Sequence, residues 1–501
     1  MSERAVAGQG AAGDDGSGRW RRSDLAALAV VSFAGLLVAV NLSLLIPVLP
    51  AITADLRTSG SAAQWLLTST LLASAVAVPV AGRLGDLYGK RNLLIVSALL
   101  LTTGALLSAL GGSLPAMIAG RAVVGLASGA IPLGISLLTT TLPRDRVASG
   151  VALVSAMLGI GGALGIPFAA FVGEHANYHV LFWIIAAGGA LSVAGIRLLL
   201  PEPPGRATGR LDLPGTVLLA GALVCLLLPL SQAAGWGWGA TSTLGLLAAA
   251  VVLLALFVGW ERRSPSPLVD VVVNARPALL LTNLASTFVG FALFATLIGT
   301  SAYVEAPQAT GYGFGASILT GGLCLLPSGL AMLLVAPVSA AITTRFGPKV
   351  TLATGAVVIA AGFVLRVTLD GQLWEIILGT AVASGGGSIA YASMPALIGR
   401  AAPRAELAAA NGLNTLCRAF GSSVASAVGG TLFASQLVLV AGRPFPSHGA
   451  YRLLFGLCAA AAVLAALIAL TVPVRSEPDS EASTELAEQP APAPAGEPAA
   501  G

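Results

Sequence analysis

The sequence predicts an all-α membrane protein in which two six-helix repeats flank an inserted two-helix hairpin, giving fourteen transmembrane helices. Hydrophobic residues make up 56% of the chain and charged residues only 10%, whereas soluble domains average roughly 25% charged residues. Apolar segments of about 20 residues, the length that spans a bilayer, recur along the chain. Basic residues collect in every second gap between these segments, which sets the number of helices.

The apolar segments must be helices because lipid offers no partner to free backbone N–H and C=O groups. Proline residues inside several segments predict kinks, which neighbouring helices in a bundle tolerate. The fourteen segments cover residues 25–49, 63–82, 92–112, 115–140, 148–173, 180–200, 213–234, 243–260, 277–303, 316–341, 350–369, 374–398, 408–435 and 452–473.

The basic residues orient this array. With the N-terminus placed inside, the inner segments hold 19 of the 26 Lys and Arg residues. The outer gaps hold only Arg57, Arg443 and Arg452. Four more lie within helices, namely Arg121, Arg197, Arg366 and Arg418. Such a bias follows the positive-inside rule, so both termini are predicted to lie in the cytoplasm. Only two of the basic residues are Lys, and Ala, Gly and Pro are abundant, a composition typical of a GC-rich bacterial genome. We therefore predict a bacterial inner-membrane protein.

An internal repeat relates the two halves of the chain. The stretch Leu87-Tyr88-Gly89-Lys90-Arg91 is similar to Arg345-Phe346-Gly347-Pro348-Lys349, which follows it by 258 residues. Two parallel repeats of this kind place a substrate site between them near the middle of the membrane. The predicted organisation is a disordered cytoplasmic segment 1–24, a six-helix bundle 25–200, an inserted hairpin 213–260, a second six-helix bundle 277–473 and a disordered cytoplasmic tail 474–501.

A glycine-rich, charged motif fills the inner gap between the second and third helices. It reads Gly82-Arg83-Leu84-Gly85-Asp86-Leu87-Tyr88-Gly89-Lys90-Arg91. Glycines permit a tight turn and a close helix approach, and Asp86 is favoured at a helix N-terminus. The motif resembles the signature G-x-L-G-D-x-x-G-[RK]-[RK] of the major facilitator superfamily. The resemblance implies a transporter whose halves are latched on the cytoplasmic side by Gly82, Gly85, Asp86, Gly89, Lys90 and Arg91. The alternative, basic residues that only anchor topology, leaves the glycines and Asp86 unexplained.

Two further segments resemble motifs of the same superfamily. Arg121 begins a stretch that matches R-x-x-x-G in the fourth helix, and the resemblance links this arginine to proton transfer. A charge at that depth costs about 2.5–3.5 kcal/mol, so Arg121 should face a polar cavity or pair within its own half. In the fifth helix Gly161, Gly165 and Pro167 resemble the antiporter motif, although Ile166 precedes the proline. The two glycines would also serve helix packing alone.

The candidates for proton coupling are few. The chain as a whole resembles the fourteen-helix drug:proton antiporter branch, which usually carries an acidic residue in the first helix. Here that position is Asn41, nine residues before Pro50, and it cannot titrate. No acidic residue falls in the middle of a predicted span. Glu305, at the outer end of the ninth helix, is therefore the best candidate, with an exposed rim charge as its alternative reading. Asp24 is a weaker one.

A polar stripe follows the thirteenth helix. Asn411, Asn414 and Arg418 share one helical face by their spacing. A polar face within a span meets a cavity or another helix, so we assign the three to the substrate cavity, with structural hydrogen bonding as the alternative. Arg121 and Arg418 with no mid-span acid favour an anionic or electron-rich substrate, or pairing with Glu305.

These features together predict a carrier that exports small amphipathic molecules, such as antibiotics, by proton antiport. The alternatives are a facilitator or importer of a metabolite, favoured by Asn41, and a membrane sensor that does not transport. The sequence holds no Walker A loop, metal-ligand cluster or catalytic constellation, so we expect no enzyme activity, cofactor or metal. The expected partners are a small-molecule substrate, protons and the lipid bilayer, without nucleic acid, and the chain is expected to be a monomer.

Overall fold

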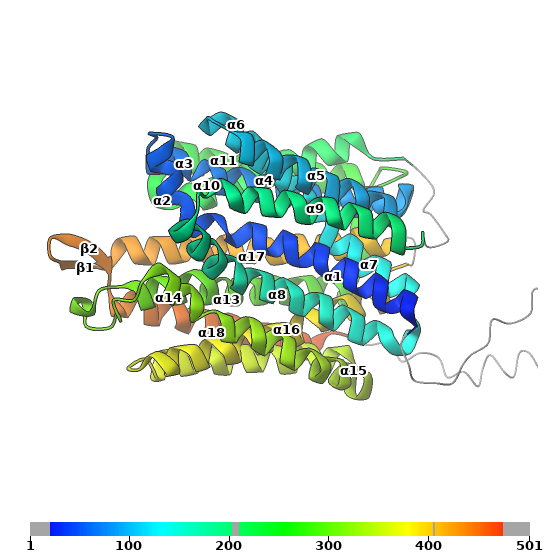
Figure 1. The fold of residues 1–501 in the computed structure, drawn as a ribbon. Helices are drawn as coiled ribbons and strands as arrows, with labels where there is room; N and C mark the ends of the chain where they lie inside the picture. The colour runs from blue at the N-terminus through cyan, green and yellow to red at the C-terminus, as the bar shows by residue number, and fades with distance from the viewer. Residues whose placement is uncertain (1–20, 203–209, 404–405, 474–501) are drawn as a thin grey trace, which may run out of the picture.

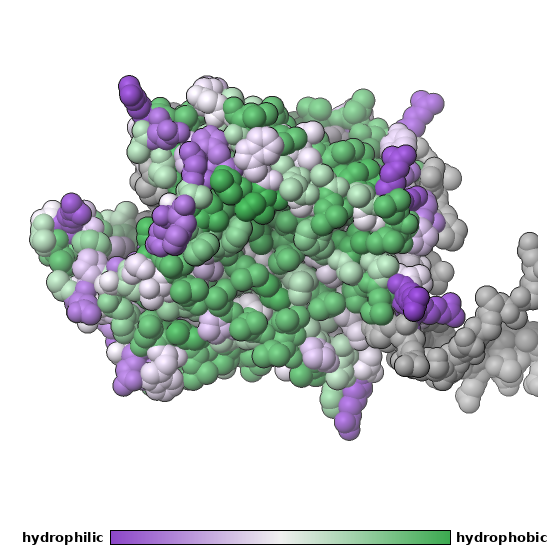
Figure 2. All heavy atoms as spheres, in the orientation of Figure 1, coloured by the Kyte–Doolittle hydropathy of each residue, from purple (hydrophilic) through white to green (hydrophobic). Residues whose placement is uncertain are grey.

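Long helices run side by side through the computed structural model, which describes residues 21–202, 210–403 and 406–473 (Figure 1). Most of the two predicted disordered ends lies outside the described residues, although the first helix already begins at Arg22. Apolar side chains form a broad band over the visible face of the bundle, and hydrophilic side chains gather at its two ends (Figure 2). This is the surface that a bilayer requires. We call the end where the first helix begins the inner end, after its predicted location.

The N-terminal half is built from helices that proline residues bend in two places. Pro47 has no N–H for the carbonyl of Ser43, and the first predicted helix is divided there into α1 and α2. Pro132 likewise cannot donate to Ser128, where a short 3₁₀ turn divides the fourth helix. The elements are α1 Arg22–Ser43, α2 Leu45–Asp55, α3 Gly60–Ala63, α4 Trp65–Tyr88, α5 Lys90–Leu110, α6 Leu114–Leu126, η1 Ala127–Gly129, α7 Ala130–Thr141, α8 Arg144–His175 and α9 His179–Leu199.

Two helices follow in the range of the predicted hairpin, and then the C-terminal half. A short antiparallel β-hairpin, which the sequence did not predict, precedes the last helix and turns at Gly442 with φ +77°. The elements are α10 Leu213–Trp236, α11 Thr241–Glu261, α12 Val271–Asn274, α13 Pro277–Glu305, η2 Gln308–Thr310, α14 Ile318–Leu323, α15 Leu326–Thr368, α16 Leu373–Ala401, α17 Leu407–Ser435, β1 Leu437–Val440, β2 Arg443–Pro446 and α18 His448–Thr471.

Twelve helical segments of the described chain are long and apolar enough to cross a membrane. One of them, Ile318–Thr368, contains two predicted spans, because α15 continues through a turn at Gly347. Another predicted span, α17, has 29 residues but is not among the twelve. Its polar residues lower its mean hydropathy, and two of them, Asn411 and Asn414, are buried within the protein. The all-helical membrane fold is thus confirmed, while the count of fourteen stays a prediction.

The repeat seen in the sequence has a counterpart in the backbone. Gly89 has φ +103° between α4 and α5, and Gly347 has φ +83° at the equivalent turn within α15. Glycine populates this left-handed region at no steric cost, which explains why both turns carry it. Each half also has its own apolar core, around Leu133 and Phe182 in the first and around Phe363 and Phe455 in the second.

The two halves meet along two seams. On one, α4 and α7 pack against α17; on the other, α8 packs against α14, α15 and α16. The inserted helix α10 packs against both α4 and α17. Its Leu219, Leu223 and Leu227 share a buried cluster with Ala75 of α4 and Leu416 of α17. The inserted hairpin therefore covers the first seam instead of standing apart from the bundle.

Candidate functional site

Asp86 links the two halves at the inner end. Its carboxylate accepts hydrogen bonds from the backbone N–H groups of Ala408, at 3.4 Å, and Ala409, at 3.1 Å. Both lie in the first turn of α17, where N–H groups have no intrahelical partner and the helix dipole favours an anion. Lys90 Nζ lies 3.8 Å from the same carboxylate. The sequence predicted that Asp86 would lie at a helix N-terminus without identifying the helix. In the structure, that helix is α17 of the opposite half.

The glycines of the same loop bring backbones into contact. A Cβ on Gly82 would lie 2.6 Å from the carbonyl oxygen of Ala408, so α4 and α17 touch here without side chains between them. A Cβ on Gly85 would overlap Leu133 of α7, and one on Gly89 would overlap the carboxylate of Glu202. Gly82, Gly85 and Gly89, three of the residues predicted to latch the halves, therefore each have a steric reason to be glycine.

The basic residues of the loop have different surroundings. Arg91 donates to the carbonyl of Arg197 at 2.6 Å, at the C-terminal end of α9, where the dipole favours a cation. Arg83 is buried, and its Nε has no hydrogen-bond partner within the described part of the chain. Across the seam, the predicted latch therefore depends on Asp86 and Gly82, while Arg91 holds the loop to α9.

Arg121 and Asn41 form a buried pair inside the N-terminal half. Arg121 donates through Nη1 to the Asn41 side-chain oxygen at 2.8 Å and through Nη2 to the Asn41 carbonyl at 3.2 Å. Both residues are about 1% exposed. The structure therefore places the arginine against the one position where the resemblance implies an acid, and the partner it finds there is neutral.

The two glycines of the antiporter-like stretch lie against the same part of α1. A Cβ on Gly161 would lie 2.6 Å from Ala39, and one on Gly165 would overlap the hydroxyl of Ser43. Two residues after Gly165, Pro167 touches α14 of the opposite half, because a Cβ on Gly322 would lie 3.0 Å from its ring. The antiporter-like stretch of α8 thus contacts the part of α1 that carries Asn41 through its glycines, and the C-terminal half through Pro167.

Glu305 is the last residue of α13 and lies beside α14. Its carboxylate accepts a short hydrogen bond from Ser301, and a Cβ on Gly321 would lie 2.6 Å from Oε1. The side chain is half-buried and, within the described chain, has no ion pair with either Arg121 or Arg418. Glu305 therefore lies beside Gly321, and the next residue, Gly322, is the point where α14 meets the N-terminal half.

The polar stripe of α17 divides into two groups. Asn414 donates to the side-chain oxygen of Asn283 on α13 at 3.0 Å, and Asn411 donates to the carbonyl of Leu407 in its own helix at 2.8 Å. Both asparagines are buried. Arg418 is only half-buried, and its guanidinium lies 4.5 Å from the centre of the Tyr391 ring on α16. Lining of the substrate cavity stays a prediction for all three, and Arg418 is the one whose side chain is partly exposed.

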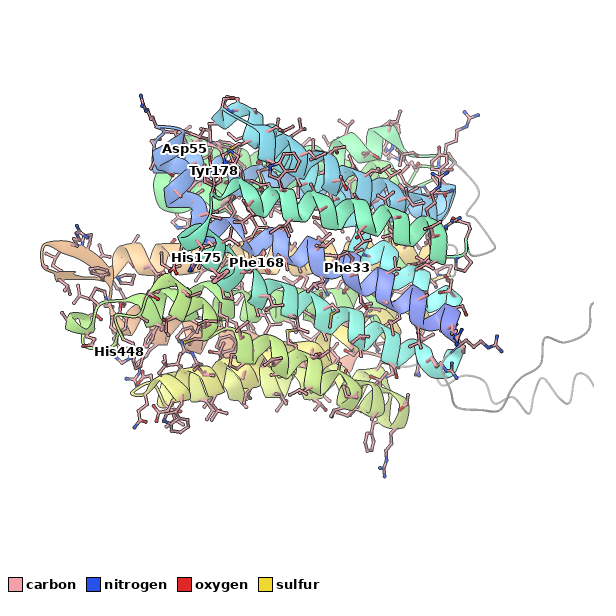
Figure 3. The ribbon with its side chains drawn as sticks, in the orientation of Figure 1. Phe33, Asp55, Phe168, His175, Tyr178 and His448 are labelled. Carbon is pink, nitrogen blue, oxygen red and sulfur yellow. The ribbon has the colours of Figure 1, made fainter. Side chains whose placement is uncertain are left out.

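Each half also has polar contacts of its own at the outer end. Tyr178 donates to Asp55 at 2.7 Å, and burial together with this carboxylate raises the pKa of the tyrosine. In the C-terminal half, His448 Nε2 lies 2.6 Å from Asp370 Oδ2. Figure 3 shows Tyr178, Asp55 and His448 at the same end of the bundle. These contacts tie loops to helices within one half, whereas Asp86 ties one half to the other.

Arg366 is a buried charge that sequence reasoning counted but did not single out. Its side chain is 2% exposed, and both Nη atoms lack hydrogen-bond partners in the described chain. The guanidinium lies 4.5 Å from the Phe455 ring centre and 5.2 Å from that of Tyr303, so cation–π attraction stabilises it. Its position within a predicted span was the signal that could have found it.

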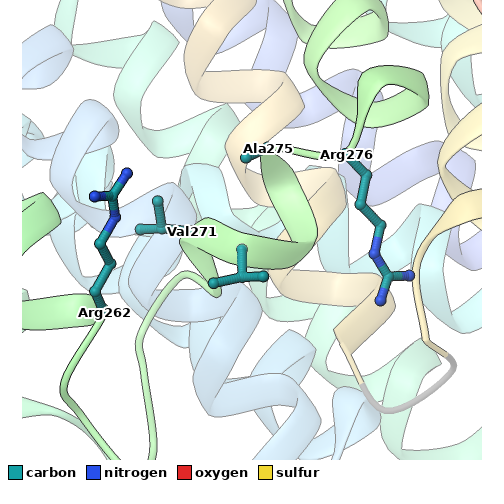
Figure 4. A pocket seen from close by; sticks show the side chains of 5 residues that line it. Arg262, Val271, Ala275 and Arg276 are labelled. Atoms are coloured by element: carbon teal, nitrogen blue, oxygen red, sulfur yellow. The ribbon is translucent and has the colours of Figure 1, made fainter.

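A pocket of about 330 Å³ lies at the inner surface. It is lined by Arg262, Val271, Val272, Ala275 and Arg276. The two guanidinium groups point away from each other on either side of α12 instead of converging (Figure 4). This pocket offers no common binding point for a ligand, and no residue of the α17 stripe lines it.

Comparison with known proteins identifies related sequences over nearly the whole chain. Residues 31–306 and 279–497 match the profile of the Major Facilitator Superfamily. The tetracenomycin C resistance and export protein of Streptomyces glaucescens is 31% identical over 438 residues, which cover 84% of this chain and 78% of that protein. The probable actinorhodin transporter of Streptomyces coelicolor is 29% identical, covering 77% and 68%. The multidrug resistance protein Stp of Mycobacterium tuberculosis is 25% identical, covering 78% and 72%.

Solved structures share the fold at low sequence identity. The human organic anion transporter MFSD10 superposes with a TM-score of 0.63 at 16% identity, over 90% of this chain and 100% of that chain. The proton:xylose symporter XylE superposes with a TM-score of 0.62 at 14% identity, over 90% and 96%. At these identities the likeness shows the arrangement of helices and not the substrate.

Proposed function

Because this chain belongs to the major facilitator superfamily, we propose that it exports small amphipathic molecules, antibiotics among them, from a bacterial cell in exchange for protons. The names of its relatives from Streptomyces and Mycobacterium, which refer to export and multidrug resistance, support this function. The structural observation that supports it best is the contact of Asp86 with the first turn of α17. A transporter that rocks its halves needs a link between them that can form and break.

The latch has the strength expected of a reversible contact. Hydrogen bonds to a charged group contribute about 1.5–3 kcal/mol each, enough to bias two states without locking one. We assign the structure to a state closed at the inner end, because Gly82 and Ala408 bring α4 and α17 into contact there. Opening would withdraw Asp86 from α17, and Lys90, 3.8 Å away, would keep its charge compensated.

Glu305 is the proposed proton carrier. It ends α13, where a negative charge is disfavoured by the helix dipole, and it lies beside Gly321 of α14. The next residue, Gly322, contacts Pro167 of the opposite half. Protonation of Glu305 would remove a charge beside this contact, and we propose that this change shifts the balance between open and closed outer ends.

A facilitator without proton coupling is the second candidate, and one observation favours it. Asn41 occupies the position where the branch carries an acid, and it accepts a hydrogen bond from Arg121 without titrating. An uncoupled carrier would dissipate a substrate gradient but could not build one. Uphill transport is therefore the property that separates the two candidates.

The test is transport by the purified chain in liposomes with an imposed pH gradient. We expect a drug to accumulate against its gradient, and an uncoupler to abolish that accumulation. Glu305→Gln should abolish it while leaving downhill exchange intact, whereas Glu174→Gln, which removes an exposed acid from the same end, should change neither. Accumulation that survives the uncoupler would refute proton coupling, and accumulation that survives Glu305→Gln would refute the role of this residue.

The setting in the membrane is proposed on the same basis. The excess of basic residues in the inner segments supports cytoplasmic termini in a bacterial inner membrane. A monomer would suffice, because both halves of the transporter come from one chain. Protease or antibody access to each terminus in sealed vesicles of known orientation tests the first proposal, and the mass of the detergent-solubilised protein tests the second.

A further inference from the structure

We propose that Arg418 and Tyr391 form an anion-binding subsite in the middle of the membrane, and that the exported molecules are organic anions with a flat aromatic body. This inference depends on the proposed function, since it names the substrate class of the same passage. It follows from the orientation of α17, the geometry of Arg418 and the distribution of charge along the helices.

Three consecutive residues fix the orientation of α17. Neighbouring residues of a helix point about 100° apart. Gly412 lies against Val78 of α4, where a Cβ would be 3.0 Å from the carbonyl oxygen. Leu413 packs in the apolar cluster to which α10 contributes, and Asn414 bonds to α13. Three sides are thus occupied, and the direction of Thr415 is the one that remains, toward the interior between the halves.

The remaining face is open. Arg418, Ala419 and Ser426 follow Thr415 at helical spacing and so share its face. Ala419 and Ser426 are exposed, while Thr415 and Arg418 are half-buried. Since α10, α4 and α13 cover the other sides of the helix, this exposure is to space inside the bundle and not to the lipid around it. Arg418 lies eleven residues after the start of α17 and seventeen before its end, about 17 Å from the inner end of the helix.

Arg418 is held ready for a ligand. Its guanidinium lies 4.5 Å from the Tyr391 ring centre, a cation–π contact that holds the group beside the ring. The hydrogen bond that it donates is long, 3.4 Å from Nη2 to Thr415 Oγ1. A planar guanidinium with free N–H groups binds a carboxylate or an ionised phenol through paired hydrogen bonds. Tyr391 beside it offers an apolar surface to an aromatic ring.

The distribution of charge selects the sign of the substrate. Acidic residues in the described helices lie in first or last turns, as Asp86 and Glu305 do, whereas Arg121 and Arg418 lie well inside theirs. Arg121 has Asn41 as its acceptor, but Arg418 has no comparable partner in the described chain. A cation at mid-membrane without a counter-charge is costly, and an anionic substrate would supply that charge, whereas a cationic substrate would be repelled.

The test compares fluorescein with rhodamine 123, which share a fused three-ring body but differ in charge. In proteoliposomes we expect the wild-type chain to transport fluorescein at least about tenfold faster than rhodamine 123. Arg418→Gln should slow fluorescein about tenfold or more, the loss expected for hydrogen bonds to a charged group, without slowing rhodamine 123. Arg197→Gln, which removes an exposed arginine from α9, is the matched control and should change neither rate.

Three further variants separate binding from folding. Arg418→Lys keeps the charge and should retain part of the fluorescein transport, and Tyr391→Phe keeps the ring and should retain most of it. Tyr391→Leu should lose several-fold. Transport of rhodamine 123 but not of fluorescein would overturn the inference and leave export standing. Unchanged fluorescein transport by a well-folded Arg418→Gln variant would also overturn it. Transport of neither dye would count against the proposed function and the inference together.

Discussion

Asn41 and Arg121 lie 80 residues apart in the sequence and are joined by two hydrogen bonds in the buried interior of the N-terminal half. One bond uses the asparagine side chain, and the other uses its backbone carbonyl, at the junction of α1 and α2. Two of the guanidinium nitrogens are therefore bonded without a carboxylate, while Nε has no hydrogen-bond partner in the described chain. This arrangement separates two roles of the first helix, since it keeps an acceptor for Arg121 but provides no proton-binding group.

Asn41→Ala should destabilise the protein. The substitution leaves Arg121 Nη1 buried without its acceptor, which costs about 1–3 kcal/mol. We expect a lower midpoint of thermal unfolding in detergent and slower transport. Asn41→Asp keeps an acceptor oxygen at the same place and should lose less stability than Asn41→Ala. An unchanged unfolding midpoint for Asn41→Ala would show that the pair contributes little.

Gly82→Ala should open the inner end. The added methyl group would lie 2.6 Å from the carbonyl oxygen of Ala408, and such overpacking costs about 1–3 kcal/mol. A cysteine placed at Ala340, buried between the halves, should then react faster with a maleimide added from the inner side. The measurement uses a chain whose four native cysteines are replaced. Gly399→Ala is the control, because a Cβ there meets open space. Equal labelling rates for the two variants would contradict the proposed latch.

Gly165→Ala should separate α8 from α1. Its methyl group would overlap the hydroxyl of Ser43, next to the segment that carries Asn41, and the expected loss of stability is again about 1–3 kcal/mol. Gly173→Ala lies on the same helix but would meet only Val48, at an ordinary contact distance of 3.4 Å. We therefore expect a lower thermal midpoint for the first variant and little change for the second. If both variants unfold at the same temperature, close packing of α8 on α1 is not what requires the glycine.

Glu406 should make stability depend on pH. Burial and the nearby carboxylate of Asp270 raise the pKa of Glu406, although Arg83 and Arg276 oppose this shift. Between its ordinary pKa and the raised one, the folded protein holds a proton that the unfolded chain has released, so stability falls as pH rises through this window. Glu406→Gln should therefore raise the unfolding midpoint at neutral pH. That gain should vanish in acid, below both pKa values. A gain that is the same at both pH values would exclude titration of Glu406 as its cause.

The sequence predicted the helices well because lipid imposes two strong constraints on it. Apolar length marks each span, and the placement of basic residues marks each gap. The exceptions are informative. The span over α17 carries Asn411, Asn414 and Arg418, which lower its mean hydropathy, so composition alone understates it. The β-hairpin that turns at Gly442 left no comparable signal.

The candidate site could be predicted only in part. The motif around Asp86 was recognisable, and so was the need of that carboxylate for a helix N-terminus. The identity of that helix was not, because Ala408 and Ala409 offer only backbone groups, which any sequence provides. The polar stripe on α17 could also be recognised, but helical spacing shows only that its residues share one face of the helix. It does not show which other helix packs against that face. Which residues meet α13 and which meet open space depended on the packing.

The amino-acid sequence by itself determined the membrane fold, the repeat and the family, because these depend on hydrophobic length, charge placement and local motifs. The tertiary structure decided which groups became partners. It set Arg121 against Asn41, Asp86 against the first turn of α17, and Arg418 on the ring of Tyr391. Such contacts join residues that are far apart along the chain, and they depend on distances and angles between packed helices, which no local pattern of residues encodes.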